Sequence, residues 1–204
     1  MLQIYNAIKG DYYRERTQKL WAISDVGQAR KFKAANFDYC TFSGIFTIRN
    51  DKALIKHSGL LCVDFDHLNS IETLFNRLLK DEYFDTQLLF CSPSGDGLKW
   101  IISIDTADTT HGDYFTSVAN YISQTYGIAV DKSGQDISRA CFLPHDSQAF
   151  INPIYLKYQR KQSEYAMTKD NFRLHSEKEM NFLFRVQPKI TQVKPIWNAR
   201  KSRL

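Results

Sequence analysis

The sequence predicts an α+β fold in which a mainly antiparallel sheet has helices packed on one side. Three apolar or β-branched runs over residues 60–66, 86–91 and 99–104 are typical of buried strands. Two segments, 71–79 and 111–126, place apolar residues at helical spacing. A short Ser/Gly-rich segment joins the second and third runs, which favours a hairpin and therefore antiparallel pairing.

Composition indicates a soluble chain of 204 residues with one domain and small appendages. Hydrophobic residues make up 43% and charged residues 24%, and the net charge of +5 permits a polyanionic partner. No apolar run approaches the ~20 residues of a membrane span, and no signal peptide is present, so we expect no membrane contact. The four cysteines are widely separated, which favours reduced thiols and a cytoplasmic location.

The first 37 residues are expected to form helices near 11–23 and 25–36, the second beginning at Asp25 as N-cap. Their basic residues are more often a solvated helical face than a nucleic-acid surface. Residues 39–49 are rich in β-branched and aromatic side chains and predict a strand, with Gly44 marking a bulge or a close backbone approach.

The run at 60–66 ends in two acids, Asp64 and Asp66. Side chains alternate along a strand, so the two carboxylates point the same way while Phe65 points into the core. Two like charges held together repel each other, and a divalent cation commonly compensates a pair of hard oxygen ligands. The alternative is a pair of solvated acids that precedes the helix at 71–79, which Ser70 would cap.

The segment 92–99 joins two strands and carries groups suited to an anion. Ser92 and Ser94 offer hydroxyl groups, Gly95 and Gly97 allow backbone amides to converge, and Lys99 adds a positive charge. Because no helix follows and the spacing differs, the segment is not a Walker loop. The alternative is a plain β-hairpin turn.

A third acid follows the helix at 111–126, which Gly127 is expected to end. Residues 128–130 predict a short strand that ends in Asp131. Asp136 and Arg139 come next, before another apolar segment, and they either contribute to a site or form a local ion pair.

These motifs, in this order, resemble the archaeo-eukaryotic primase (primase-polymerase) superfamily. Residues 41–44 (TFSG), 57–60 (HSGL) and 63–68 (VDFDHL) resemble more narrowly its VirE N-terminal-like branch of bacteria and phages. The resemblance spans about residues 38–155, and it implies a catalytic core built on an RRM-like sheet, with a flanking N-terminal αβ portion.

The resemblance also implies the roles of individual residues in a two-metal site for Mg²⁺ or Mn²⁺. The implied metal ligands and catalytic acids are Asp64, Asp66 and Asp131, with Asp136 left open as an alternative to Asp131. The implied nucleotide-binding residues are Ser92, Ser94, Gly95, Gly97, Lys99 and Arg139. Lys99 stands where the superfamily most often has His, which puts the catalytic rate in question while still allowing phosphate binding.

The implied function is a DNA primase/polymerase-type nucleotidyltransferase that makes or extends primers from nucleoside triphosphates. Its partners would be a single-stranded DNA template and a replicative helicase, in replication of bacterial, plasmid or phage DNA. A helicase-like ATPase is often fused to such domains, so the chain is expected to be either a stand-alone protein or a fragment. Three alternatives are an inactive nucleic-acid-binding module, a nuclease or toprim-like phosphotransfer domain, and a structural sheet protein. Residues 39–49 lack the acid that toprim domains place before their D-x-D pair.

The predicted organisation has four parts. Residues 1–37 form an N-terminal helical portion of the same domain, and residues 38–156 form the primase-like core, with an edge strand near 150–156. Residues 157–185 are expected to form a helical extension, with a helix over 168–179. Residues 186–204 form a basic, flexible tail that either is disordered or follows a phosphate backbone.

Overall fold

The computed structural model describes residues 1–157 of the chain. The predicted helix over 168–179 and the basic tail over 186–204 lie outside the described residues. Within the described part, no helix combines the length and the apolar character that crossing a membrane requires.

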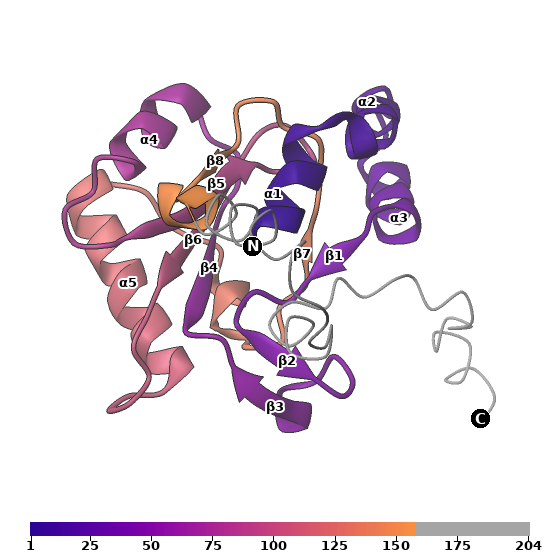
Figure 1. Cartoon of the computed structure of the whole chain (residues 1–204). Helices are drawn as coiled ribbons and strands as arrows, with labels where there is room; N and C mark the ends of the chain where they lie inside the picture. The colour runs from indigo at the N-terminus through magenta and orange to yellow at the C-terminus, as the bar shows by residue number, and fades with distance from the viewer. Residues whose placement is uncertain (158–204) are drawn as a thin grey trace, which may run out of the picture.

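A four-stranded antiparallel sheet forms the centre of the fold (Figure 1). Its strand order is β4 (Leu60–Phe65), β6 (Leu98–Ser103), β5 (Thr86–Cys91) and β8 (Phe150–Ile151). Because β4 and β5 each run antiparallel to β6, they are parallel to each other and flank it. The predicted α+β class with a mainly antiparallel sheet is therefore confirmed. An edge strand is present as β8, but it covers only the first two residues of the predicted range 150–156.

Helices α4 (Ile71–Leu78) and α5 (His111–Tyr126) pack on one face of this sheet (Figure 1). Leu74 and Leu78 of α4, together with Phe115 and Val118 of α5, join the apolar residues of β4 and β6 in one core. Gly127 ends α5 with φ at +69°, as its position in the sequence predicted. These two helices therefore pack against β4 and β6 and hold them in position on this face of the sheet.

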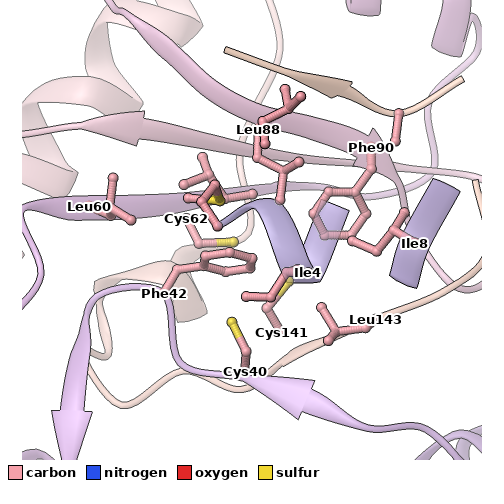
Figure 2. Packing of buried hydrophobic residues seen from close by; sticks show 14 of the residues in the cluster. Ile4, Ile8, Cys40, Phe42, Leu60, Cys62, Leu88, Phe90, Cys141 and Leu143 are labelled. Atoms are coloured by element: carbon pink, nitrogen blue, oxygen red, sulfur yellow. The ribbon is translucent and has the colours of Figure 1, made fainter. Parts of the chain in front are cut away.

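Helix α1 (Leu2–Lys9) covers the opposite face, so the expectation of helices on one side only is wrong. Ile4 and Ile8 are fully enclosed there against Leu88, Phe90 and other sheet residues (Figure 2). The helix was missed because it has only eight residues and its N-cap, at Met1, makes no side-chain bond. Its two buried isoleucines supply the packing that stabilises it.

The same core contains three cysteines, Cys40, Cys62 and Cys141, beside Phe42 (Figure 2). All four cysteines of the chain are free thiols, as the spacing predicted. Burial raises the pKa of Cys40 far above its ordinary value, so this thiol stays protonated.

Two helices predicted near the N-terminus are present. After the short helix η1 (Asp11–Tyr13), α2 spans Arg14–Trp21 and α3 spans Val26–Asn36. Asp25 is the N-cap of α3, and its carboxylate accepts a hydrogen bond of 2.7 Å from the backbone amide of Gln28. This helical pair extends beside the hairpin segment that joins β5 to β6.

The single strand predicted over residues 39–49 is two strands with different partners. Strand β1 (Tyr39–Cys40) pairs with β7 (Cys141–Phe142), while β2 (Gly44–Phe46) pairs with β3 (Leu54–His57), which follows η2 (Asp51–Ala53). A β-carbon on Gly44 would lie 2.8 Å from the carbonyl oxygen of Lys56, so the expected close backbone approach is present.

Residues 128–130 do not form the short strand that the sequence predicted. They run past the end of β4, where the backbone amide of Asp131 donates a 2.9 Å hydrogen bond to the carbonyl oxygen of Asp64. The helix η3 (Lys132–Gln135) follows at once. A single backbone bond thus places Asp131 beside the acids of β4.

Candidate active site

Asp64, near the end of β4, lies opposite Lys99 of β6 in the antiparallel pair. Their side chains form an ion pair and are only 6% and 11% exposed. The carboxylate oxygen that contacts Lys99 also lies 3.5 Å from the Arg139 guanidinium. The other oxygen, Oδ1, is buried and has no hydrogen-bond partner among the described residues. A buried carboxylate oxygen without a partner is costly and is a ready ligand for a cation.

Asp66 follows two residues later and is the exposed member of the acidic pair. Its partial burial, and then the negative charge of Asp64, raise its pKa above the ordinary value. The hairpin segment packs directly against this stretch, because a β-carbon on Gly97 would lie 2.1 Å from the carbonyl oxygen of Phe65. Glycine at position 97 therefore allows the hairpin to approach the acids.

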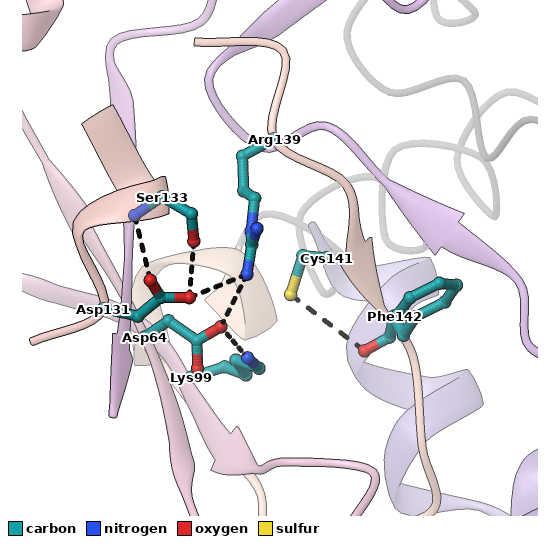
Figure 3. A network of polar contacts seen from close by, with 7 residues as sticks. All are labelled: Asp64, Lys99, Asp131, Ser133, Arg139, Cys141 and Phe142. Carbon is teal, nitrogen blue, oxygen red and sulfur yellow. Dashed lines mark hydrogen bonds and ion pairs between the residues drawn. The ribbon is translucent and has the colours of Figure 1, made fainter. Parts of the chain in front are cut away.

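Asp131 caps η3 by accepting a hydrogen bond of 3.0 Å from the backbone amide of Ser133. Its carboxylate also accepts a bond of 2.9 Å from Arg139 (Figure 3). Burial opposes ionisation of Asp131, but the hydrogen bonds from Ser133 and the charge of Arg139 outweigh it and lower the pKa. Asp131 is therefore a carboxylate at neutral pH.

The three acids converge: one carboxylate oxygen from each of Asp64, Asp66 and Asp131 lies within 4.8 Å of the other two. Hard oxygen donors at this spacing suit Mg²⁺ or Mn²⁺, and the unpartnered Oδ1 of Asp64 supplies a free ligand atom. Asp136, the alternative third acid, is not in this group, and its carboxylate instead accepts hydrogen bonds from Ser138.

The guanidinium group of Arg139 pairs with Asp131 and Asp64, whereas the hydrogen bond of Arg139 to Asp136 joins the two backbones at 3.0 Å. The two cations, Lys99 and Arg139, thus neutralise part of the acidic cluster (Figure 3). Burial opposes the charge of Lys99, yet the surrounding groups, Asp64 among them, raise its pKa. Lys99 therefore remains an ammonium group within the site.

A cavity of about 420 Å³ opens beside these residues. Its lining includes the site residues Asp64, Asp66, Ser92, Ser94, Lys99 and Arg139, the cations Lys33 and Arg49, the acids Asp38 and Asp136, and the rings of Tyr39 and Phe142. The hydroxyl oxygen of Ser92 is buried without a hydrogen-bond partner among residues 1–157. Two cations at the cavity, Lys33 and Arg49, were not predicted as site residues, because they come from α3 and from the loop after β2 and belong to neither the D-x-D pair nor the hairpin segment.

Gly95 and Gly97, predicted to bind the nucleotide through their backbone amides, lie in the turn between β5 and β6. The amide of Gly95 donates a 3.0 Å hydrogen bond to the carbonyl oxygen of Ser92, so it is used within the turn. Gly95 has φ at +82°, a backbone conformation that favours glycine. Neither Gly95 nor Gly97 is among the residues that line the cavity. They shape the turn, while Ser92 and Ser94 line the cavity.

Trp21 of α2 contacts this turn, and sequence reasoning did not predict that contact. Its indole N–H donates a 3.0 Å hydrogen bond to the carbonyl oxygen of Pro93. Its ring also lies against Gly95, where a β-carbon would be 3.1 Å from the indole nitrogen. The two partners are more than 70 residues apart, so no local pattern signals the contact.

Comparison with known proteins gives one match. The family model described as BT4734-like, N-terminal domain matches residues 31–150, which is more than half of the chain. The matched part contains the three converging acids, Lys99 and Arg139. No curated protein and no solved structure matches the chain.

Proposed function

The chain belongs to the family of BT4734-like N-terminal domains, and we propose that it is a DNA primase-polymerase-type nucleotidyltransferase. In this proposal it synthesises or extends primers on single-stranded DNA during replication of bacterial, plasmid or phage DNA, together with a replicative helicase. The fold would be the catalytic core of the primase-polymerase superfamily, which the D-x-D pair and the hairpin motif resemble.

The observation that carries the proposal is the convergence of three carboxylates beside a cavity with four cationic side chains. Asp64, Asp66 and Asp131 approach within 4.8 Å. The cavity beside them is lined by Lys33, Arg49, Lys99 and Arg139. Acids that can hold divalent metals next to cations that can hold phosphates are the two parts that phosphoryl transfer needs.

Asp64, Asp66 and Asp131 would hold the two Mg²⁺ or Mn²⁺ ions. When bound, the metals would activate the attacking hydroxyl group and neutralise the charge that develops on the pyrophosphate leaving group. Among the described residues, Oδ1 of Asp64 has no hydrogen-bond partner, and the carboxylate of Asp66 forms no ion pair. A metal ion could therefore bind these oxygens without first breaking an ion pair.

The remaining residues bind and orient the triphosphate. The Ser92 hydroxyl, buried without a partner among the described side chains, is available to a phosphate oxygen. Lys33 has a lowered pKa, because it is partly buried and because the Lys99 ammonium lies nearby. A polyanion between these two cations would relieve their repulsion and stabilise the bound state.

The test is incorporation of nucleotides into a primed or unprimed template with Mg²⁺ or Mn²⁺, comparing wild type with Asp131→Asn. We expect the variant to lose at least about 100-fold in rate, because a metal ligand is removed. Asp108→Asn, an exposed acid outside the site, is the matched control and should retain activity. Calorimetric titration with Mn²⁺ gives a second readout. Equal incorporation by the wild type and Asp131→Asn would contradict the proposal.

A second candidate, an inactive nucleic-acid-binding module, is favoured by the ion pair of Asp64 with Lys99. An ammonium group that neutralises a metal ligand competes with the metal for that carboxylate. This candidate predicts binding of single-stranded DNA without incorporation. Incorporation by the wild type separates the two, since only the first candidate predicts it.

A further inference from the structure

A second groove lies next to the first cavity, between the turn that joins α2 to α3 and the hairpin segment. The groove encloses about 300 Å³. Its lining residues include Leu20, Ile23, Val26, Arg30, Lys33 and Asp66. Lys33, Asp66 and Ser94 line both spaces. Asp66 therefore stands where the two meet.

We propose that this second groove binds the 3′-terminal nucleotides of the strand that is extended, an inference that rests on the proposed function. Strand extension brings two substrates to one acidic centre, a nucleoside triphosphate and a strand end. The first cavity contains the phosphate-binding cations next to Asp64. The second groove reaches the same centre by way of Asp66 and is the space left for the other substrate.

The chemistry of the groove matches a nucleic-acid strand. Leu20, Ile23 and Val26 form the apolar side of the groove; Leu20 is buried, whereas Val26 is 65% exposed and offers a surface against which a base can pack. Arg30 and Lys33 lie three residues apart on α3, so they point from the same side of the helix. This spacing presents two cations to the phosphates beside the apolar wall.

The acids of the groove do not oppose a strand end. Asp96 forms a 2.7 Å hydrogen bond with the ring of His67, and Asp66 belongs to the group of acids that would hold the metals. The charged side chains that α3 itself contributes to the groove, Arg30 and Lys33, are both cations. The α3 wall attracts the phosphates, while Asp66 lies where the strand end must react.

Trp21 does not itself line the groove, but it contacts the hairpin on both sides of Ser94, which does, so it can report on a ligand bound next to it. Trp21 directly follows Leu20, contacts the hairpin at Pro93 and Gly95, and is 55% exposed. Of the two other tryptophans, Trp100 is fully buried and Trp197 lies outside the described residues. In a Trp197→Phe background, quenching of fluorescence by an added ligand reports contact at Trp21.

The experiment titrates this protein with a short single-stranded oligodeoxythymidine without nucleoside triphosphate, following fluorescence and, separately, the anisotropy of labelled DNA. We expect saturable quenching, and we expect Arg30→Glu to weaken binding about tenfold. Lys31→Glu is the matched control: it makes the same change of charge on the same helix, and Lys31 does not line the groove. It should weaken binding by less than about threefold.

Equal weakening by the two variants, or DNA binding by anisotropy without quenching, would overturn the assignment of the groove. The proposed function is judged apart from this by incorporation. If only Arg30→Glu loses DNA affinity but the wild type incorporates no nucleotide, the groove is still a strand-binding site and the proposed enzymatic activity is rejected. If the wild type incorporates nucleotides but Arg30→Glu and Lys31→Glu weaken DNA binding equally, only the assignment of the groove is rejected.

Discussion

Asp64 and Lys99 form a nearly buried ion pair across β4 and β6, at the centre of the proposed site. Removing one member of such a pair leaves an uncompensated charge in a region that water hardly reaches. Because Arg139 lies 3.5 Å from the same carboxylate oxygen, it compensates only part of the lost charge. The stability of the metal-free protein and its proposed affinity for metal therefore both depend on the carboxylate of Asp64.

The first prediction concerns this pair. Lys99→Met should lower the free energy of unfolding by about 3 kcal/mol, because the buried Asp64 loses its closest cationic partner. The double variant Asp64→Asn with Lys99→Met should recover most of that loss, since no charge is left without a partner. Urea denaturation of the single and double variants measures both effects. Additive losses in the double variant would show that the pair is not coupled.

The second prediction concerns Asp66, whose raised pKa reflects burial and repulsion by Asp64. A raised pKa in the folded state means that stability falls as pH rises above the ordinary value of 3.8. Asp66→Asn should therefore stabilise the protein in EDTA at pH 7, by about 0.5 kcal/mol because the carboxylate is exposed and water screens the repulsion.

The same variant should behave in the opposite way toward metal. Asp66→Asn is expected to lose the thermal stabilisation that Mn²⁺ gives to the wild type, because a proposed ligand has been removed. In the wild type, Mn²⁺ affinity should rise with pH through the raised pKa of Asp66, since the proton competes with the metal. Differential scanning fluorimetry with and without Mn²⁺ measures both. Unchanged Mn²⁺ stabilisation in the variant would remove Asp66 from the ligand set.

The third prediction tests the fit of the hairpin against the acids. Gly97→Ala should lower the free energy of unfolding by about 2–3 kcal/mol, because the added methyl group would meet the backbone of Phe65 at 2.1 Å. Gly112→Ala is the matched control in the first turn of α5, where the nearest atom would be 3.5 Å away. It should be neutral or stabilising. Similar losses in the two variants, measured by denaturation, would contradict this interpretation of the hairpin.

Much of the fold was predictable because the informative segments are long or strongly patterned. The buried strands at β4, β5 and β6 and the amphipathic helices α4 and α5 have local signals that tertiary packing reinforces. The short strands β1 and β2 were merged, because a two- or three-residue strand is defined by its distant partner and not by its own pattern.

The candidate site was predictable to a similar extent. The alternation of β4 indicated Asp64 and Asp66, and the structure brings Asp131 to them as expected, although by a backbone hydrogen bond and not by a strand. Sequence reasoning missed Lys33 and Trp21, because both reach the site from helices remote in the chain. It assigned the glycines to phosphate binding, whereas the amide of Gly95 is used within the turn.

The last prediction concerns two histidines that join three separate segments. The amide of Gly59 donates to Nδ1 of His57 at 3.0 Å, so His57 carries its proton on Nε2. That nitrogen lies 3.2 Å from Nδ1 of His111, whose Nε2 lies 3.3 Å from the carbonyl oxygen of Gly134. One set of tautomers satisfies all three bonds, and it requires both rings to be neutral.

Burial lowers the pKa of both rings, and His111 further lowers that of His57. For a base with a lowered pKa, the stabilisation is present above the ordinary value of 6.5 and is lost as pH falls below it. Between pH 7.5 and 5.5 we expect the free energy of unfolding to fall, because the unfolded chain takes up protons on these two rings more readily than the folded chain does. His111→Gln keeps a donor for Gly134 and should halve this dependence, as measured by urea denaturation across pH. His67→Gln, at a ring that is 88% exposed, is the control. An unchanged pH dependence in His111→Gln would show that protonation of this pair does not limit stability in acid.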